Sequence, residues 1–155
     1  EIKEEMRQTE GAPELKQAIR QKQQSLLTGS ARKAVTEANV ILTNPTHFAV
    51  ALRYDPKKDF APMVVARGRG ETALAIRSLA AENNVPILEY PQLARAIYFT
   101  ARAGQTIAED LYVAVATILA FVFNIDRAMA EGISPPLVEV PSEKHFDENG
   151  VRHAT

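Results

Sequence analysis

The chain has 155 residues, of which 46% are hydrophobic and 24% charged, and its formal net charge is −1. This length and composition suit one globular domain with a real core and extensions. The nearly neutral charge and the lack of a basic-aromatic pattern argue against nucleic-acid binding. Cysteine is absent, which excludes disulfides and Cys-ligated metal sites and fits a reducing cytoplasm.

Residues 1–37 are rich in Glu, Lys, Arg and Gln, which favour helices. They predict a long or broken helical connector, with Gly11 and Pro13 marking the break. A solvated tether is the alternative. Basic residues such as Lys16 and Arg20 suggest contact with anionic lipid headgroups, but the acidic residues among them weaken that idea, so we favour a plain connector.

Residues 38–131 have the pattern of a compact domain. The expected elements are strands at residues 39–43, 48–54, 62–66 and 87–88, and helices at residues 71–82, 92–101 and 108–129. The longest apolar stretch, residues 111–123, has about thirteen residues, fewer than the roughly twenty of a membrane span, so it should be a buried helix. The order of elements indicates an α/β fold: a small mixed β-sheet flanked by helices, after the long helical connector.

Residues 132–155 predict a flexible tail, because Pro135, Pro136 and Pro141 stand among charged and small residues. A short partner-binding segment at residues 137–140 is an alternative that we favour less.

The segment Asn44-Pro45-Thr46-His47 has a chemical consequence. The usual side reaction of Asn uses the nitrogen of the next residue, and proline has no N–H to offer. The Asn44 amide is then left to attack its own backbone carbonyl. Collapse of the adduct expels the Pro45 nitrogen and leaves a cyclic imide at Asn44, so one chain becomes two.

The surroundings of the motif favour a rigid turn. Asn44 precedes proline and is pushed toward an extended conformation, and the β-like runs at residues 39–42 and 48–52 flank the motif. A turn fixed between paired strands can store strain and hold the amide near the carbonyl. Thr46 can orient this turn, and His47 can accept the amide proton or protonate the departing nitrogen. The plainer interpretation is an inert Asn-Pro turn with a solvated histidine.

Other patterns carry less chemistry. The segment from Arg67 to Thr72 joins a strand to a helix, where phosphate can bind, but Ala73 replaces the third glycine of a dinucleotide fingerprint. The histidines, His47, His145 and His153, lack the spacing of a zinc motif. We therefore expect no cofactor and no metal.

Further stretches accompany the motif in a fixed order. They are Glu10-Gly11-Ala12-Pro13-Glu14, Val85-Pro86-Ile87, Leu93-Ala94-Arg95-Ala96-Ile97-Tyr98 and Gly104-Gln105-Thr106-Ile107. With them, the chain up to about residue 124 resembles the cytoplasmic domain of the FlhB/YscU family, the export-switch proteins of flagellar and virulence type III secretion systems. Residues 61–68 and 81–86 favour the flagellar branch. Ala12 stands where the family usually has Asp or Ser.

The resemblance implies a function. Such proteins cleave themselves between Asn and Pro, here Asn44 and Pro45, and the two pieces stay associated. The cleaved domain helps the export gate change from early to late substrates. The implied partners are other export-gate proteins, a secreted hook or needle length-control protein, and secretion substrates, with no nucleic acid. The implied location is the cytoplasmic face of the bacterial inner membrane, with this soluble part joined to a preceding multi-pass membrane region.

Two rival hypotheses remain. One is a structural adaptor of the same export machinery whose turn never breaks. The other is a phosphate-binding enzyme at residues 67–71, which predicts saturable nucleotide binding that raises thermal stability. Self-cleavage at Asn44-Pro45 is single-turnover chemistry within one molecule, so we do not expect a turnover enzyme.

Overall fold

The computed structural model describes residues 2–45 and 47–153, and in the first helix the side chains from Ala12 onward. Thr46 lies outside the described residues. The elements are α1 (Ile2–Gln24), α2 (Gly29–Thr36), β1 (Val40–Asn44), β2 (Phe48–Arg53), β3 (Met63–Arg69), α3 (Glu71–Glu82), β4 (Ile87–Glu89), α4 (Pro91–Thr100), η1 (Glu109–Leu111), α5 (Tyr112–Phe123), α6 (Ile125–Ala130) and η2 (Ser142–Lys144).

The four strands form one mixed sheet in the order β3-β2-β1-β4. Strand β2 pairs antiparallel with both β1 and β3, whereas β4 pairs parallel with β1. The predicted small mixed sheet is therefore confirmed. Strand β1 lies inside the sheet, paired with β2 as far as Asn44 and with β4 as far as Thr43.

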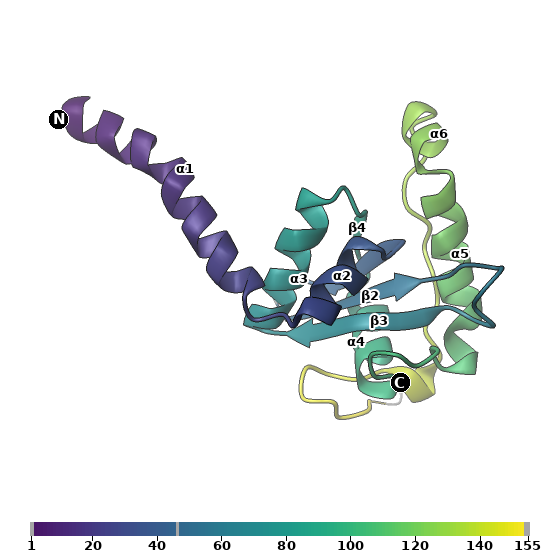
Figure 1. The fold of residues 1–155 in the computed structure, drawn as a ribbon. Helices are drawn as coiled ribbons and strands as arrows, with labels where there is room; N and C mark the ends of the chain where they lie inside the picture. The colour runs from purple at the N-terminus through teal and green to yellow at the C-terminus, as the bar shows by residue number, and fades with distance from the viewer. Residues whose placement is uncertain (1, 46, 154–155) are drawn as a thin grey trace.

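Helices cover both faces of the sheet (Figure 1). Because side chains alternate along a strand, Leu42 and Val50 pack with α4 and α5 in one buried cluster. Ile41 and Ala51 pack on the opposite face with α2 and α3 in a second cluster. The described chain thus has three layers, with the sheet between two hydrophobic cores.

Strand β3 is longer than the sequence predicted. It reaches Arg69 because the pairing with β2 continues to Phe48↔Arg69, so Gly68 belongs to the strand and not to a connection. The register shifts opposite Ala51 and Leu52, which pair with Ala66 and Val64. The extra residue is a β-bulge, and it places Val64 and Ala66 on opposite faces of the sheet.

One helix prediction is narrowed and another is wrong. Helix α1 continues through Pro13, so the connector takes the long form and not the broken form that the sequence left open. The single helix expected over residues 108–129 is divided into η1, α5 and α6. The side chain of Asn124 donates to the Ala120 carbonyl at 3.0 Å and competes with the helix backbone at that point.

Helix α5 is the predicted buried helix, with Val115 and Ile118 fully buried. Within the described residues, no helix combines the length and the apolar character that a membrane crossing requires.

Helix α1 leads away from the sheet, and its first turns extend beyond the rest of the domain (Figure 1). Its other end is attached to α3, where Glu82 accepts from Arg20 at 3.3 Å and from Gln24 at 2.9 Å. The polar connection fits the predicted connector, although the boundary at residue 37 remains a prediction.

Residues 132–153 lie along the compact domain. Val140 is buried, and Val138 and Phe146 pack against the cluster formed with α4 and α5. The Tyr90 hydroxyl donates to the Pro136 carbonyl. Composition predicted a flexible tail, and both its flexibility and a partner-binding role for residues 137–140 remain predictions.

Candidate functional site

Asn44 is the last residue of β1 and lies directly opposite Phe48, the first residue of β2. Only 7% of its surface is exposed. Its neighbour Thr43 is held by β4: the Thr43 carbonyl accepts from the Tyr90 amide at 3.0 Å. The pairing on both sides fixes the backbone up to the predicted cleavage point.

The motif forms a tight turn between two paired strands. The His47 amide donates to the Asn44 carbonyl at 3.0 Å, and the His47 carbonyl accepts from the Gly70 amide at 2.9 Å. The first of these bonds closes a β-turn. The second ties the far side of the turn to the junction of β3 and α3. The carbonyl of the predicted scissile bond therefore faces a fixed hydrogen-bond donor.

The side-chain amide nitrogen of Asn44 has an unusual environment. Nδ2 is buried, and among the described residues it has no hydrogen-bond partner. A buried polar group without a partner costs about 1–3 kcal/mol, so such groups are rare and call for an explanation. The unpartnered atom is the one that the motif chemistry uses as nucleophile.

The imidazole of His47 points toward the tail. Its Nε2 lies 3.2 Å from Glu148 Oε1, and both side chains are about half exposed, at 49% and 56%. Within residues 2–45 and 47–153, Glu148 is the side chain that lies within hydrogen-bond distance of the His47 ring. The backbone of His47 thus contacts Asn44 directly. The His47 ring lies against Glu148, and its predicted role in proton transfer stays a prediction.

Aromatic residues hold the β2 side of the turn, which sequence reasoning missed. Phe48 is buried, with its ring 4.8 Å from Tyr98 and 5.4 Å from Phe99. The guanidinium of Arg69 lies over the Phe48 ring, 5.2 Å from its centre. The sequence signal for this cluster was the pair of adjacent aromatic residues in α4, Tyr98 and Phe99. Their partner Phe48 lies about fifty residues earlier in the chain, so only the fold shows that the rings meet.

The glycine-rich segment before α3 is already occupied. The Gly70 amide donates to His47, and Arg67 packs 4.4 Å from the centre of the Tyr98 ring while donating to the Tyr98 carbonyl. These groups therefore bind the turn between β1 and β2 and the aromatic cluster beside it, which weakens the phosphate-binding hypothesis.

The remaining candidates have structural partners. His145 Nε2 lies 2.6 Å from the Val140 carbonyl, and His153 Nε2 lies 2.9 Å from Asp147. Arg95 donates to the Phe146 carbonyl at 2.7 Å. In the part of the chain that the structure describes, no cluster of His, Cys, Asp or Glu is arranged to hold a metal ion.

Fold and site together define a small three-layer α/β domain with an Asn-Pro turn at the end of a central strand. A sequence model described as the FlhB HrpN YscU SpaS family matches residues 1–122. The chain belongs to this family.

The curated relatives include flagellar biosynthetic protein FlhB of Escherichia coli (strain K12), 45% identical over 150 residues that cover 94% of this chain and 39% of that protein. FlhB of Salmonella typhimurium is 47% identical over 140 residues, covering 90% of this chain and 37% of that protein. These matches support the flagellar branch. The chain spans less than two-fifths of the length of these relatives.

Solved structures share the fold. The cytoplasmic domain of FlhB from Shewanella putrefaciens has a TM-score of 0.64 at 37% identity, covering 79% of this chain and 95% of that one. A mutated EscU C-terminal domain has a TM-score of 0.61 at 32% identity, covering 64% of this chain and 99% of that one. The resemblance expected from the sequence is confirmed.

Proposed function

We propose that this chain is the self-cleaving switch domain of a flagellar protein-export apparatus, and that it cuts itself once between Asn44 and Pro45. The observation that carries the proposal is the buried, unpartnered Asn44 Nδ2 beside a backbone carbonyl that accepts from the His47 amide. Membership of the FlhB HrpN YscU SpaS family supports the export role.

The step is an intramolecular acyl transfer. A bond forms between Asn44 Nδ2 and the Asn44 carbonyl carbon, and the bond from that carbon to the Pro45 nitrogen breaks. Nδ2 loses one proton and the Pro45 nitrogen gains one. The products are a chain ending in a cyclic imide at Asn44 and a chain beginning at Pro45, and no co-reactant is needed.

The turn favours this step in two ways. The paired strands restrict the backbone at Asn44, which reduces the entropic cost of closing the ring. The His47 amide, 3.0 Å from the carbonyl oxygen, stabilises the negative charge that develops there during attack. In this mechanism His47 acts through its backbone. Thr46 shapes the turn.

Both fragments keep their places after the cut. Residues up to 44 supply β1, and later residues supply the strands on each side of it. The cleaved turn then changes the surface offered to partners, which we propose are other export-gate proteins, a secreted length-control protein and secretion substrates. In a longer protein with membrane helices, the domain would work at the cytoplasmic face of the inner membrane.

Intact mass under denaturing conditions tests the proposal. We expect the wild type to give fragments of residues 1–44 and 45–155, and the Asn44→Ala variant to give one chain. Asn124→Ala, which alters an exposed asparagine outside the turn, is the matched control and should be cut like the wild type. An uncut wild type after long incubation would leave the non-cleaving adaptor as the better explanation.

A second variant separates the two roles of His47. Replacement by alanine keeps the backbone amide and removes the imidazole. If the backbone donor is what matters, His47→Ala should retain cleavage within about tenfold of the wild-type rate, whereas loss of a general acid or base costs about 100-fold or more. A loss of that size would restore the imidazole as the proton carrier.

A further inference from the structure

The C-terminal residues form a small hairpin of their own, here called the tail hairpin (residues 145–153). Phe146 and Arg152 form an antiparallel bridge, and the His153 amide donates to the His145 carbonyl at 2.7 Å. At the tip, the Asp147 carboxylate accepts from the amides of Asn149 and Val151, both at 2.9 Å. These hydrogen bonds define a hairpin between residues 145 and 153.

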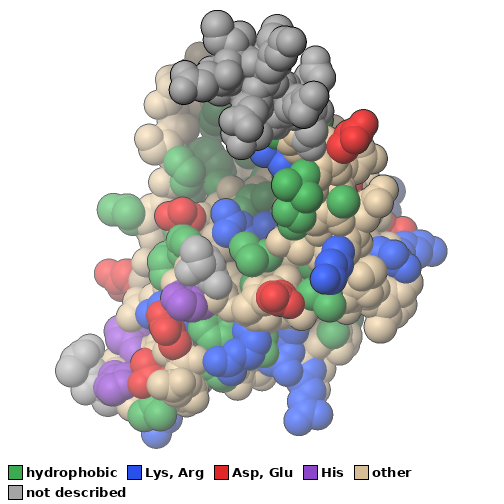
Figure 2. Space-filling model, turned by 90° about the vertical axis from the view of Figure 1, so that its left-hand side faces the viewer, with side chains coloured by type: hydrophobic (Ala, Val, Ile, Leu, Met, Phe, Trp, Pro, Cys, Tyr) green, Lys and Arg blue, Asp and Glu red, His purple; other side chains and the backbone are tan. Residues whose placement is uncertain are grey.

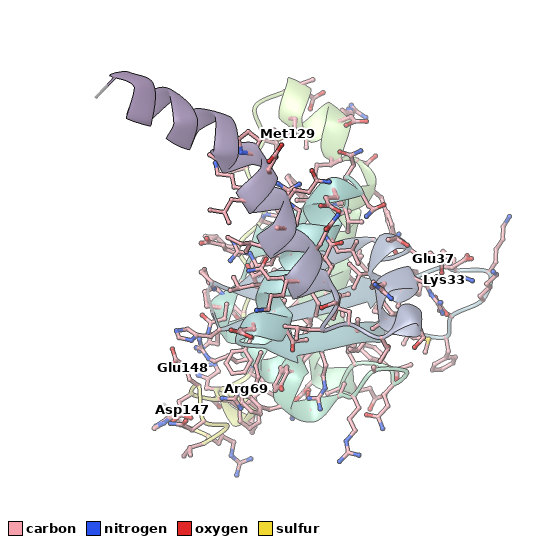
Figure 3. The ribbon with its side chains drawn as sticks, turned by 60° about the vertical axis from the view of Figure 1, so that its left-hand side comes forward. Lys33, Glu37, Arg69, Met129, Asp147 and Glu148 are labelled. Carbon is pink, nitrogen blue, oxygen red and sulfur yellow. The ribbon has the colours of Figure 1, made fainter. Side chains whose placement is uncertain are left out.

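The tip of the tail hairpin lies against the cleavage turn. Glu148 Oε1 is 3.2 Å from His47 Nε2, and the Glu148 carbonyl accepts from Arg69 at 3.3 Å. Figure 3 shows Arg69, Asp147 and Glu148 at one end of the molecule, away from Lys33 and Glu37. Figure 2 shows histidine side chains beside acidic ones at a lower corner of the surface. The structure pairs His47 with Glu148 and His153 with Asp147.

Apolar contacts anchor the base of the hairpin to α4. The ring of Phe146 lies 5.6 Å from that of Phe99, which in turn packs 5.4 Å from Phe48. The Phe146 carbonyl accepts from Arg95 at 2.7 Å. The tip of the hairpin thus contacts His47, which directly precedes β2. The base of the hairpin packs on Phe99, which in turn packs on Phe48 at the start of β2.

Gly150 allows this close approach. Its φ is +79°, and a Cβ atom there would lie 2.9 Å from Cε1 of Phe99. Both the backbone conformation and the contact distance disfavour a side chain at this position. A glycine that fits against a residue 51 positions earlier indicates a specific docked arrangement.

We propose that the tail hairpin is a clasp for the cleavage turn: it docks on His47, Arg69 and Phe99 and holds the start of β2 against the sheet. All of its partners follow Pro45 in the chain. This consequence rests on the proposed function: after the cut, the clasp stays attached and keeps the new amino-terminal end in place. A partner that needs this end must first displace the hairpin.

Amide hydrogen exchange measured by NMR tests the clasp, with the full chain carrying Asn44→Ala as the uncut parent. The Gly70 amide reports on the turn because it donates to His47, and the Val151 amide reports on the hairpin because it donates to Asp147. Glu148→Ala removes the pair with His47. We expect Gly70 exchange to rise by about two- to fivefold, the range for an exposed polar side-chain contact.

Gly150→Ala should act more strongly, because the new methyl group cannot fit against Phe99, and we expect at least about a tenfold rise at Gly70. Gly132→Ala is the matched control: its φ is also positive, at +72°, but nothing lies within 4 Å of the added atom. The Ile41 amide in the central strand should keep its protection in every variant and thereby show that the fold is intact.

Two results would overturn the clasp. One is a Val151 amide without protection in the parent, which would mean that the hairpin does not form. The other is faster exchange at Val151 with unchanged exchange at Gly70, which would mean that the hairpin leaves the turn unaffected. An uncut wild type would count against cleavage alone, since the clasp is measured in the uncut parent.

Discussion

Asn44 and Thr43 are the polar residues of the described chain that are buried as whole residues, backbone included, and they differ in how their side chains are hydrogen-bonded. The Thr43 hydroxyl donates to the Leu88 carbonyl at 3.4 Å, whereas Asn44 Nδ2 lacks a partner among the residues described. Adjacent residues in one strand thus have opposite energetic roles. The Thr43 hydroxyl joins β1 to β4. The buried amide nitrogen of Asn44 lacks a partner among the described residues, which is unfavourable, and the proposed cleavage would change its surroundings.

A second residue with a strong local role is Asp59. Its carboxylate, 3% exposed, accepts from Arg53 at 2.8 Å and from the Asp55 amide at 2.9 Å. The hydrogen bonds from the Arg53 side chain and then from the Asp55 backbone hold the pKa of Asp59 below its ordinary value. The ionised form therefore favours the folded state and closes the loop between β2 and β3.

We expect Asp59→Asn to lower stability at neutral pH, by roughly 1–3 kcal/mol because Arg53 loses a charged acceptor. Since the folded pKa lies below the unfolded one, this contribution is present above the ordinary carboxyl pKa and is lost as pH falls through the folded value. The difference between wild type and variant should therefore shrink on acidification. Urea unfolding from about pH 7 to about pH 3 measures it, with the exposed Glu143→Gln as control. A difference independent of pH would contradict this account.

At the scale of elements, β3 and α3 approach so closely that one position requires glycine. A Cβ atom at Gly68 would lie 2.6 Å from Cγ2 and 3.1 Å from the backbone carbon of Thr72. Helix α3 begins two residues after β3 ends, so it turns back onto the strand immediately. This short connection also positions the Gly70 amide that donates to the His47 carbonyl in the turn between β1 and β2.

Gly68→Ala should therefore cost about 1–3 kcal/mol of unfolding free energy, as overpacking does. Gly29→Ala is the matched control, because nothing lies within 4 Å of the added atom, and it should change stability by no more than about 0.5 kcal/mol. Adding Thr72→Ser to Gly68→Ala removes the nearest methyl group and should recover part of the loss. Equal effects of the two glycine variants in denaturant unfolding would show that the close approach is not what selects Gly68.

The elements show how far sequence reasoning reaches. Periodicity and turn chemistry locate β1, β2 and α3 within a residue or two, because those signals are local. The extension of β3 to Arg69 depends on pairing with β2, and the division at Asn124 depends on a side-chain hydrogen bond, so neither has a local signature. For the candidate site, the motif predicts the residues of the turn, but the donor role of the His47 backbone needs the closed turn. The contacts of residues 145–153 join segments distant in sequence, which composition alone does not show.

At the scale of the whole molecule, the proposed cut would divide the sheet between two chains. Strand β1 would belong to one chain, and β2, β3 and β4 to the other. Dissociation would remove an inner strand and expose both buried clusters. The two chains should therefore separate only when the domain unfolds.

We expect the cleaved protein to elute as one species in native gel filtration and to unfold in a concentration-dependent manner. Unfolding that releases two chains gains about 1.4 kcal/mol of apparent stability for each tenfold rise in concentration. The uncut Asn44→Ala variant should show no such dependence. Separate elution of the fragments under native conditions would refute the shared-sheet account.

The position of α1 has a mechanical consequence. Helix α1 projects from the domain (Figure 1), and it leads through α2 directly into β1. In the uncut chain, a pull on α1 passes along β1 and through covalent bonds into β2. Once the bond after Asn44 is broken, the same pull ends at β1, which is retained by its ladders with β2 and β4. Breaking one bond would thus replace a covalent connection by one that gives way when the hydrogen bonds and packing of β1 are pulled apart.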